Sequence, residues 1–257
     1  MSDRRILRIS GPDARDFLQG LVTNDVARLD QGLVYAALLT PQGKYMADFF
    51  LVPQADAILL DAPSAQGDML VQRLSMYKLR AKVEIGETEL HLHRGLEDAP
   101  EDGFADPRDP DLGWRAYRAH PQQEDTVDWD ALRVAHLVPE SGVELTPDTF
   151  ILEAGFERLQ GVDFRKGCYV GQEVTARMKH KTELQKGLVR VGVTGTAPPG
   201  TEIMAGAKPA GVLYTQSGGH GIAYLRFNRA KGQMQADGAA VTWNGESGTT
   251  AKDSPPV

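Results

Sequence analysis

The residues best suited to chemistry lie in one segment, residues 161–177, which reads Gly-Val-Asp-Phe-Arg-Lys-Gly-Cys-Tyr-Val-Gly-Gln-Glu-Val-Thr-Ala-Arg. It contains Cys168, the single cysteine of the chain, between Gly167 and Gly171. Glycine permits tight turns and lets another molecule approach the sulfur, and nearby positive charge favours the reactive thiolate. We therefore predict that Cys168 is a functional thiol and that Lys166 helps to keep it ionised. The alternative is a buried, inert cysteine.

A single cysteine limits the other kinds of site. It excludes an intrachain disulfide and cannot supply the several thiolates of a protein-held zinc or iron–sulfur centre. We therefore expect no resident metal site. A helix that begins near Gln172 would direct its unpaired N–H groups toward the thiol and favour an anion there.

Hydrophobic patterns predict a mixed α+β arrangement in the first part of the chain, with Gly20 ending a first short helix. The predicted strands are residues 6–9, 33–39, 45–52, 57–60, 79–85 and 114–117, and the predicted helices are residues 69–77 and 129–137. Residues 33–52 form a predicted hairpin, because Pro41 and Gly43 supply its turn. We interpret residues 95–128 as a long surface excursion around one small strand.

Short strand patterns separated by Gly- and Pro-rich turns follow Lys186, at residues 188–193, 211–215, 221–226 and 239–243. They predict a separate small antiparallel barrel or sandwich. We therefore divide the chain into residues 1–185, a barrel at 186–246 and a flexible tail at 247–257.

The run Lys-Gly-Cys-Tyr-Val-Gly-Gln-Glu at 166–173 resembles the signature of the YgfZ family, relatives of the glycine cleavage T-protein. Further matches are Phe-Leu-Gln-Gly at 17–20, Thr-Asn-Asp at 23–25, the turn at 39–44 and Lys-Leu-Arg-Ala-Lys-Val at 78–83. The resemblance implies an α+β fold: a T-protein-like folate-binding portion of two mixed lobes, then a C-terminal antiparallel β-barrel, around a central channel. It also implies bound tetrahydrofolate, or a C1-substituted form, and a role in assembly or repair of iron–sulfur clusters.

Carried over onto this chain, the resemblance makes Glu153 the carboxylate that pairs with the pterin ring, where it would accept two N–H donors side by side. The alternative is a solvated surface carboxylate. Asn24 and Asp25 could hydrogen-bond the ligand or serve a turn, and Tyr169 joins the candidate folate-binding residues. Basic runs that hold Arg80 and Arg177 could bind the glutamate tail of folate or a phosphate; each is otherwise a solvated face.

The implied function is a folate-binding accessory factor for iron–sulfur clusters in client enzymes, including enzymes that modify transfer RNA. Its partners would be client or assembly proteins, with transient cluster contact through Cys168. One alternative is a folate-dependent aminomethyl or C1 transferase, but Ala47-Asp48 replaces the paired aspartates that are common in T-protein relatives. Ala47 cannot supply a carboxylate for acid–base chemistry. Another alternative is a module that binds transfer RNA through residues 177–186.

Composition argues against stable nucleic-acid or membrane binding. The net charge is −7 at pH 7, whereas nonspecific nucleic-acid binding usually needs a basic surface. No stretch reaches the roughly 20 apolar residues of a membrane span, and the chain starts without an apolar signal core. We therefore expect a cytoplasmic protein.

Overall fold

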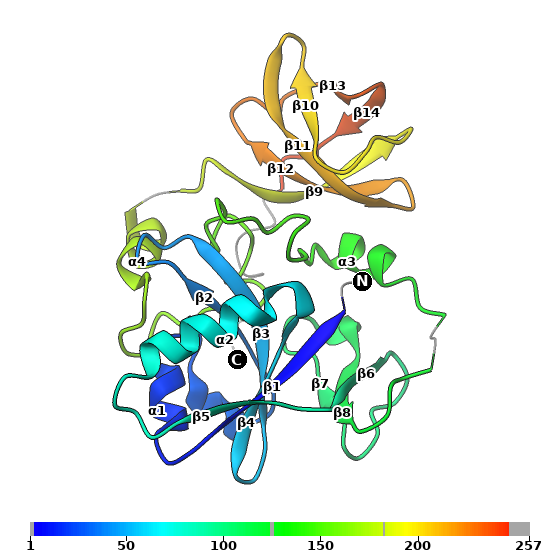
Figure 1. Cartoon of the computed structure of the whole chain (residues 1–257). Helices are drawn as coiled ribbons and strands as arrows, with labels where there is room; N and C mark the ends of the chain where they lie inside the picture. The colour runs from blue at the N-terminus through cyan, green and yellow to red at the C-terminus, as the bar shows by residue number, and fades with distance from the viewer. Residues whose placement is uncertain (1–2, 124–125, 182, 247–257) are drawn as a thin grey trace, which may run out of the picture. The chain divides into compact units, whose positions relative to one another are not determined.

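The computed structural model describes residues 3–123, 126–181 and 183–246 and divides into two compact units (Figure 1). The first unit holds the residues up to Thr126 together with Leu159–Gln172, and the second holds Val127–Arg158 with the residues from Glu173 onwards. A single cut in the chain therefore does not separate the units. The predicted folate-binding region at 1–185 is a functional assignment and stays a prediction, and the predicted tail at 247–257 lies outside the described residues.

The first unit is built on a five-stranded antiparallel sheet with the strand order β2-β3-β4-β1-β5. Its core is formed by apolar side chains of the sheet and of two helices, with Leu18 of α1 and Leu70 and Leu74 of α2 fully buried. The elements are β1 (Arg4–Ser10), α1 (Ala14–Gln19), the 3-10 helix η1 (Val26–Asp30), β2 (Val34–Leu39), β3 (Tyr45–Pro53), β4 (Ala57–Pro63), α2 (Ser64–Lys78) and β5 (Glu84–Glu87).

A smaller sheet in the same unit, of order β6-β8-β7, comprises β6 (His91–Gly95), β7 (Phe104–Ala105) and β8 (Trp114–Arg118), and η2 (Pro110–Leu112) precedes β8. A buried carboxylate joins it to the larger sheet. Asp61 of β4 is fully buried and accepts from the Arg115 guanidinium at 2.6 Å and the Tyr117 hydroxyl at 2.9 Å, both on β8. Arg4 of β1 adds a hydrogen bond at 2.6 Å. Burial opposes ionisation of Asp61, but the two arginines prevail and hold its pKa below its usual range.

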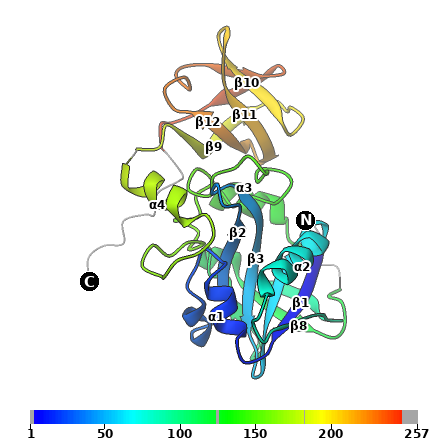
Figure 2. The same ribbon diagram turned by 60° about the vertical axis from the view of Figure 1, so that its left-hand side comes forward.

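The second unit contains α3 (Trp129–His136), most of α4 (Gln172–Lys181) and a closed six-stranded barrel of order β10-β11-β12-β9-β14-β13. The strands are β9 (Lys186–Thr194), β10 (Thr201–Ala205), β11 (Lys208–Ser217), β12 (His220–Arg226), β13 (Met234–Ala236) and β14 (Ala239–Thr242). Alternate residues of β9, among them Val189, Val191 and Val193, fill the barrel interior. Figure 2 shows the same elements from a second direction.

Most predicted elements are confirmed, including the first hairpin, the helix from Gln172 and the antiparallel barrel. The strand predicted at 79–85 is wrong over residues 79–83, and only its last two residues belong to a strand, β5. The chain instead makes local hydrogen bonds from Ala81 N to Lys78 O and from Val83 N to Ala81 O, which use donors that a strand would offer to a neighbour. Arg80 therefore lies in a turn and not on a strand face.

The sequence patterns also missed several short strands. The excursion predicted at 95–128 contains β7 as well as β8, and the barrel contains the unpredicted strands β10 and β13. Strands of two or three residues, such as β7 and β13, have too few positions for an alternation to be recognised. No helix in the described parts of the chain has the length and apolar character needed to cross a membrane.

We predict that Asp61→Asn destabilises the protein by about 3–5 kcal/mol, because it leaves two arginines with a neutral buried partner. Asp56→Asn is the matched control, since Asp56 also pairs with an arginine, Arg8, but its side chain is 78% exposed. We expect the control to lose about 1 kcal/mol or less in urea unfolding. Equal unfolding midpoints for the two variants would contradict the role of Asp61.

Candidate functional site

Thr23 holds the start of the thiol segment on the sheet. Its hydroxyl donates to Gly161 O at 2.6 Å and accepts from Ala37 N of β2 at 2.8 Å. Its backbone oxygen accepts from Asp163 N at 3.1 Å. Since Thr23 is fully buried, water cannot replace these bonds, and the segment is fixed to β2 at this point.

Asn24 and Asp25 also have structural partners. The Asn24 amide donates to Tyr35 O at 2.8 Å and to Gln160 O at 2.6 Å, so both of its N–H groups are used within the core. Asp25 caps η1 by accepting from Ala27 N at 3.0 Å. These contacts match the turn-and-cap alternative, and folate binding by either residue stays a prediction.

Asp163 is a second anchor of the thiol segment. Its carboxylate accepts from the Arg28 guanidinium at 2.6 Å and from Arg165 N at 2.7 Å. Burial opposes its ionisation, but the Arg165 amide and the Arg28 charge outweigh that effect and keep the pKa of Asp163 below its usual range. The residues before the thiol are therefore held by an ionised carboxylate.

Lys166 turns inward, toward the end of α1. Its ammonium donates to Gln19 O at 2.7 Å and to Val22 O, and it lies 5.0 Å from the centre of the Tyr169 ring. These carbonyls lie at and just beyond the C-terminal end of α1, where carbonyls lack helical partners and favour a cation. Burial lowers the pKa of Lys166 to about 8, against the opposing charge of Asp25 and Asp163. A role of Lys166 in keeping the thiol ionised stays a prediction.

The two glycines beside the thiol have different surroundings. Gly171 has a φ of +84°, and a Cβ there would lie 2.6 Å from Thr40 O in the turn between β2 and β3. A Cβ on Gly167 would meet nothing within 4 Å. Gly171 thus packs against the hairpin turn, whereas Gly167 faces open space.

Cys168 lies between Lys166 and Gly171, both of which are held by contacts with the rest of the first unit, and it is exposed. In the parts of the chain that the structure describes, its sulfur makes no hydrogen bond. This exposure contradicts the alternative of a buried cysteine, and a functional role of the thiol stays a prediction. The structure brings Lys166, Tyr169 and Asp25 together in the first unit beside Cys168; Lys166 and Tyr169 are buried, Asp25 is half-buried and Cys168 is exposed.

Glu153 belongs to the second unit and is buried, so the solvated alternative is wrong. Its Oε2 accepts from the Tyr224 hydroxyl of β12 at 2.6 Å, and its Oε1 lies 3.6 Å from Lys186 Nζ of β9. Burial, followed by the Glu153 carboxylate, raises the pKa of Tyr224, which therefore stays a proton donor. Neither partner of Glu153 could be found from the sequence, because no local pattern points to a residue such as Tyr224, 71 positions away.

The two basic candidates are exposed and lie in different units. Arg80 is in the turn after α2, and Arg177 is on α4 beside Lys179, which forms an ion pair with Glu157. Neither guanidinium forms an ion pair with any residue in the described ranges. A ligand role for each stays a prediction.

Asp48 is engaged in the core of the first unit. Its carboxylate accepts from the Tyr45 hydroxyl at 2.6 Å and the Tyr35 hydroxyl at 3.0 Å. Burial, with the Asp48 charge, raises the pKa of Tyr35 well above its usual value, so this phenol remains a donor. Ala47 is fully buried in the same sheet. The hairpin therefore offers no free carboxylate for C1 transfer.

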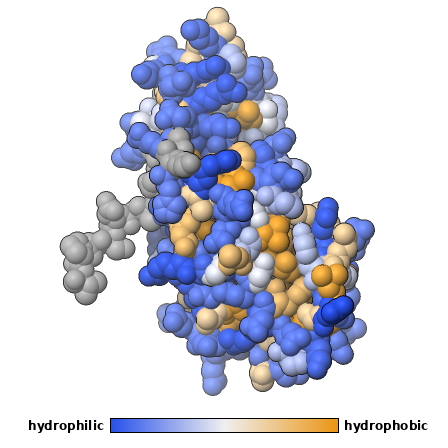
Figure 3. Space-filling model, turned by 90° about the vertical axis from the view of Figure 1, so that its left-hand side faces the viewer, coloured by the Kyte–Doolittle hydropathy of each residue, from blue (hydrophilic) through white to orange (hydrophobic). Residues whose placement is uncertain are grey.

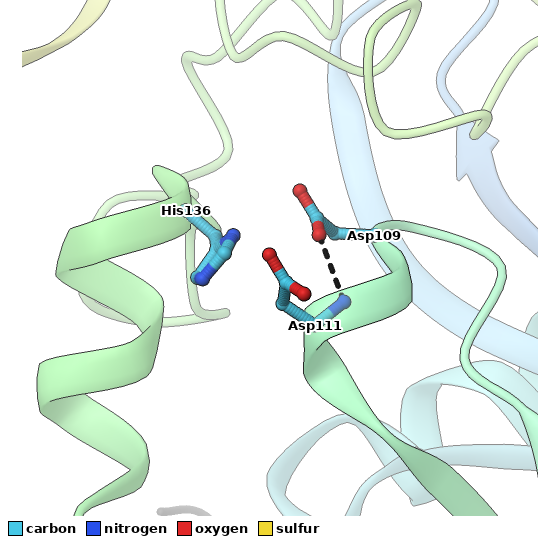
Figure 4. A group of neighbouring side chains, drawn as sticks. All are labelled: Asp109, Asp111 and His136. Carbon is cyan, nitrogen blue, oxygen red and sulfur yellow. Dashed lines mark hydrogen bonds between the residues drawn. The ribbon is translucent and has the colours of Figure 1, made fainter. Parts of the chain in front are cut away.

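Asp109 has a capping role at the start of η2. Figure 4 shows Asp109 accepting a hydrogen bond from Asp111 N, at 3.0 Å, at the start of η2. His136, drawn in the same figure, is the last residue of α3 and belongs to the second unit. The hydrogen bond fits the ordinary preference for aspartate at the start of a helical turn.

The fold is that of the aminomethyltransferase T-proteins. The structure of glycine cleavage system aminomethyltransferase T from Bartonella henselae superposes with a TM-score of 0.74 over 97% of this chain and 86% of that chain, at 15% identity. The family model for the CAF17 C-terminal beta-barrel domain matches residues 185–247. The predicted fold class is thus confirmed.

Two curated proteins specify the family. The mitochondrial iron–sulfur cluster assembly factor IBA57 of Mus musculus is 31% identical over 91% of this chain and 78% of that protein. The IBA57 homologue of Mycosarcoma maydis is 33% identical over 76% of this chain, which corresponds to 57% of that longer protein. The chain belongs to the IBA57 family of iron–sulfur cluster assembly factors.

These relatives correct one expectation. Both are mitochondrial proteins by name, which contradicts the expected cytoplasmic location. That expectation used the absence of an apolar signal core, and mitochondrial targeting segments are amphipathic and rich in arginine rather than apolar.

We predict that Gly171→Ala lowers the free energy of unfolding by about 1–3 kcal/mol, because the new Cβ meets Thr40 O and the positive φ is unfavourable for alanine. Gly167→Ala is the matched control and should change stability by about 0.5 kcal/mol or less. Urea unfolding of both variants measures the difference. The packing described for Gly171 is wrong if its variant is as stable as the control.

Proposed function

We propose that this chain assembles or repairs iron–sulfur clusters through Cys168, whose thiolate makes a transient contact with a cluster, a persulfide or a client cysteine. The observation that supports this most directly is the exposed thiol in a segment whose neighbouring residues are fixed in the core. Because the neighbouring residues are held in place, the sulfur has a defined position, and because it is exposed, a partner can still approach it. Membership of the IBA57 family supports the same role.

The partners follow from the count of thiols. Clusters are commonly held by four cysteine thiolates, and this chain supplies one. The remaining ligands must come from a client or assembly protein or from small thiols, so any cluster at Cys168 is labile. We propose client enzymes that include those acting on transfer RNA.

Cys168→Ser tests the thiol. Because the side chain is exposed, we expect unchanged thermal stability but loss of most iron–sulfur enzyme activity in cells that lack the protein and carry the variant. Ser and Cys differ little in size, so a change of packing is not the cause. A variant that restores these enzymes fully would remove Cys168 from the function.

We also propose that the chain binds tetrahydrofolate, or a C1-substituted form, with Glu153 as the partner of the pterin ring. Glu153 supports this because its buried carboxylate has one short hydrogen bond, to Tyr224, and only a long ion pair on Oε1. A carboxylate has about four acceptor positions, so N–H donors of a pterin can still be accommodated. When bound, folate would supply a carrier for C1 units.

Calorimetry with tetrahydrofolate tests this proposal. We expect micromolar binding that Glu153→Gln weakens about tenfold, or about 1.4 kcal/mol, because the amide loses charge and one acceptor. Glu202→Gln, an exposed glutamate of β10, is the control and should bind normally. Failure of the unmodified protein to bind would exclude folate from the function.

A further inference from the structure

A group of cations at the end of α2 has no neutralising partners. Arg73, Lys78, Arg80 and Lys82 form no side-chain ion pair or hydrogen bond with any residue in the described ranges. By contrast, other arginines of the first unit pair with carboxylates: Arg4–Asp61, Arg5–Glu87, Arg8–Asp56, Arg15–Asp30, Arg28–Asp163 and Arg118–Asp102. Residues 73–82 carry four positive charges and no negative one, in a chain whose net charge is −7.

Two large apolar side chains lie among these cations. Met76 is 60% exposed and Leu79 is 88% exposed, and they are three residues apart at the end of α2. Arg73 lies three residues before Met76 on α2, which places the two side chains beside each other on the helix, and Arg80 follows Leu79 in the turn. We call residues Arg73, Met76, Lys78, Leu79, Arg80 and Lys82 the α2 patch. Figure 3 shows the molecule from the left-hand side of Figure 1, where the C-terminal end of α2 lies, and apolar areas are visible among hydrophilic ones.

Leu79 is unfavourable for folding in two ways. Its backbone has φ of 42° and ψ of −102°, and Ala81 N donates to Lys78 O at 2.7 Å across it. These are the angles of the first central residue of a type II′ turn, a position that favours glycine. Leucine there strains the backbone and also exposes its apolar side chain. Neither the strained backbone nor the exposed side chain stabilises the free protein. We therefore infer that the Leu79 side chain serves in contact with another molecule.

The α2 patch is connected to the thiol segment through α1. Lys82 N donates to the Asp13 carboxylate at 2.7 Å at the start of α1, and Lys166 donates to Gln19 O at its end. Since α1 has six residues, it spans about 9 Å. Residues 82 and 166 therefore bind the two ends of one short helix, a separation smaller than the width of an ordinary protein interface.

We propose that the α2 patch docks an acidic surface of the protein that delivers a cluster to Cys168 or receives one from it. This rests on the proposed function. An apolar centre with a charged rim is the anatomy of a protein interface, and the unpaired cations select carboxylates opposite them. The overall negative charge disfavours nucleic acid, and like charges disfavour the same patch of a second copy.

Leu79→Gly in the full chain is the first test. Glycine adopts this backbone without strain, so we expect the thermal midpoint to rise by about 2–4 °C. Support of iron–sulfur enzymes in cells lacking the protein should fall about fivefold or more, because the apolar centre is lost. A variant with full support would overturn the docking role.

The second test identifies the partner. A photo-crosslinking amino acid in place of Met76, an exposed position, should capture an acidic protein. Binding of that purified protein should weaken about tenfold with Arg80→Glu and stay unchanged with Lys231→Glu, the same charge change at an exposed lysine of the second unit. Capture of nucleic acid, lipid or a second copy, or an equal loss with the control, would overturn the proposal.

Cys168→Ser separates this proposal from the function on which it rests. Partner binding retained with enzyme support lost is the expected result for both. If binding and full support are both retained, the thiol function fails and the docking surface stands. If support is lost but the patch captures no acidic protein, only the docking proposal fails.

Discussion

The hydrogen bonds from Thr23 and Asn24 to residues 160–163 are the constraint on which the thiol site depends. They join residues 138 and 136 positions apart and lie in the core, where unmade hydrogen bonds are costly. Once they form, Asp163 and Lys166 fall within reach of Arg28 and of the end of α1. The thiol segment has little regular structure of its own, so its conformation comes from these distant contacts.

Some residues of the signature at 166–173 anchor the segment, and others are exposed to solvent. Lys166 and Tyr169 are buried, Gly171 packs on a hairpin turn, and Gly167 and Cys168 face solvent. Burying a lysine is costly, but two carbonyl acceptors and an aromatic face offset part of that cost. In this chain the contacts of Lys166 therefore hold the segment that contains the thiol against the end of α1.

The local distribution of charge matters more than the net charge for the binding of a partner protein. An acidic chain would be expected to repel acidic partners, yet four cations without an ion pair in the described ranges lie within residues 73–82, at the end of α2. Near a protein surface, charges separated by more than about 8–10 Å are largely screened at physiological salt. A partner would therefore respond to the local patch, and not to the distant carboxylates.

Local signals in the sequence were enough to predict the hairpin at residues 33–52, the helix from Gln172 and four of the barrel strands, and to single out the one cysteine among its glycines. Hydrophobic period and turn chemistry are properties of neighbouring residues and can be found without a fold. Other features depend on contacts between residues far apart in the chain, which local sequence patterns do not reveal. The residues after Lys78 alternate between apolar and charged, but they form a turn, because Ala81 N donates to Lys78 O and Lys82 N donates to the Asp13 carboxylate. The burial of Lys166 and the pairing of Glu153 with Tyr224 likewise depend on which distant groups meet, since burial and hydrogen bonding are set by the whole chain.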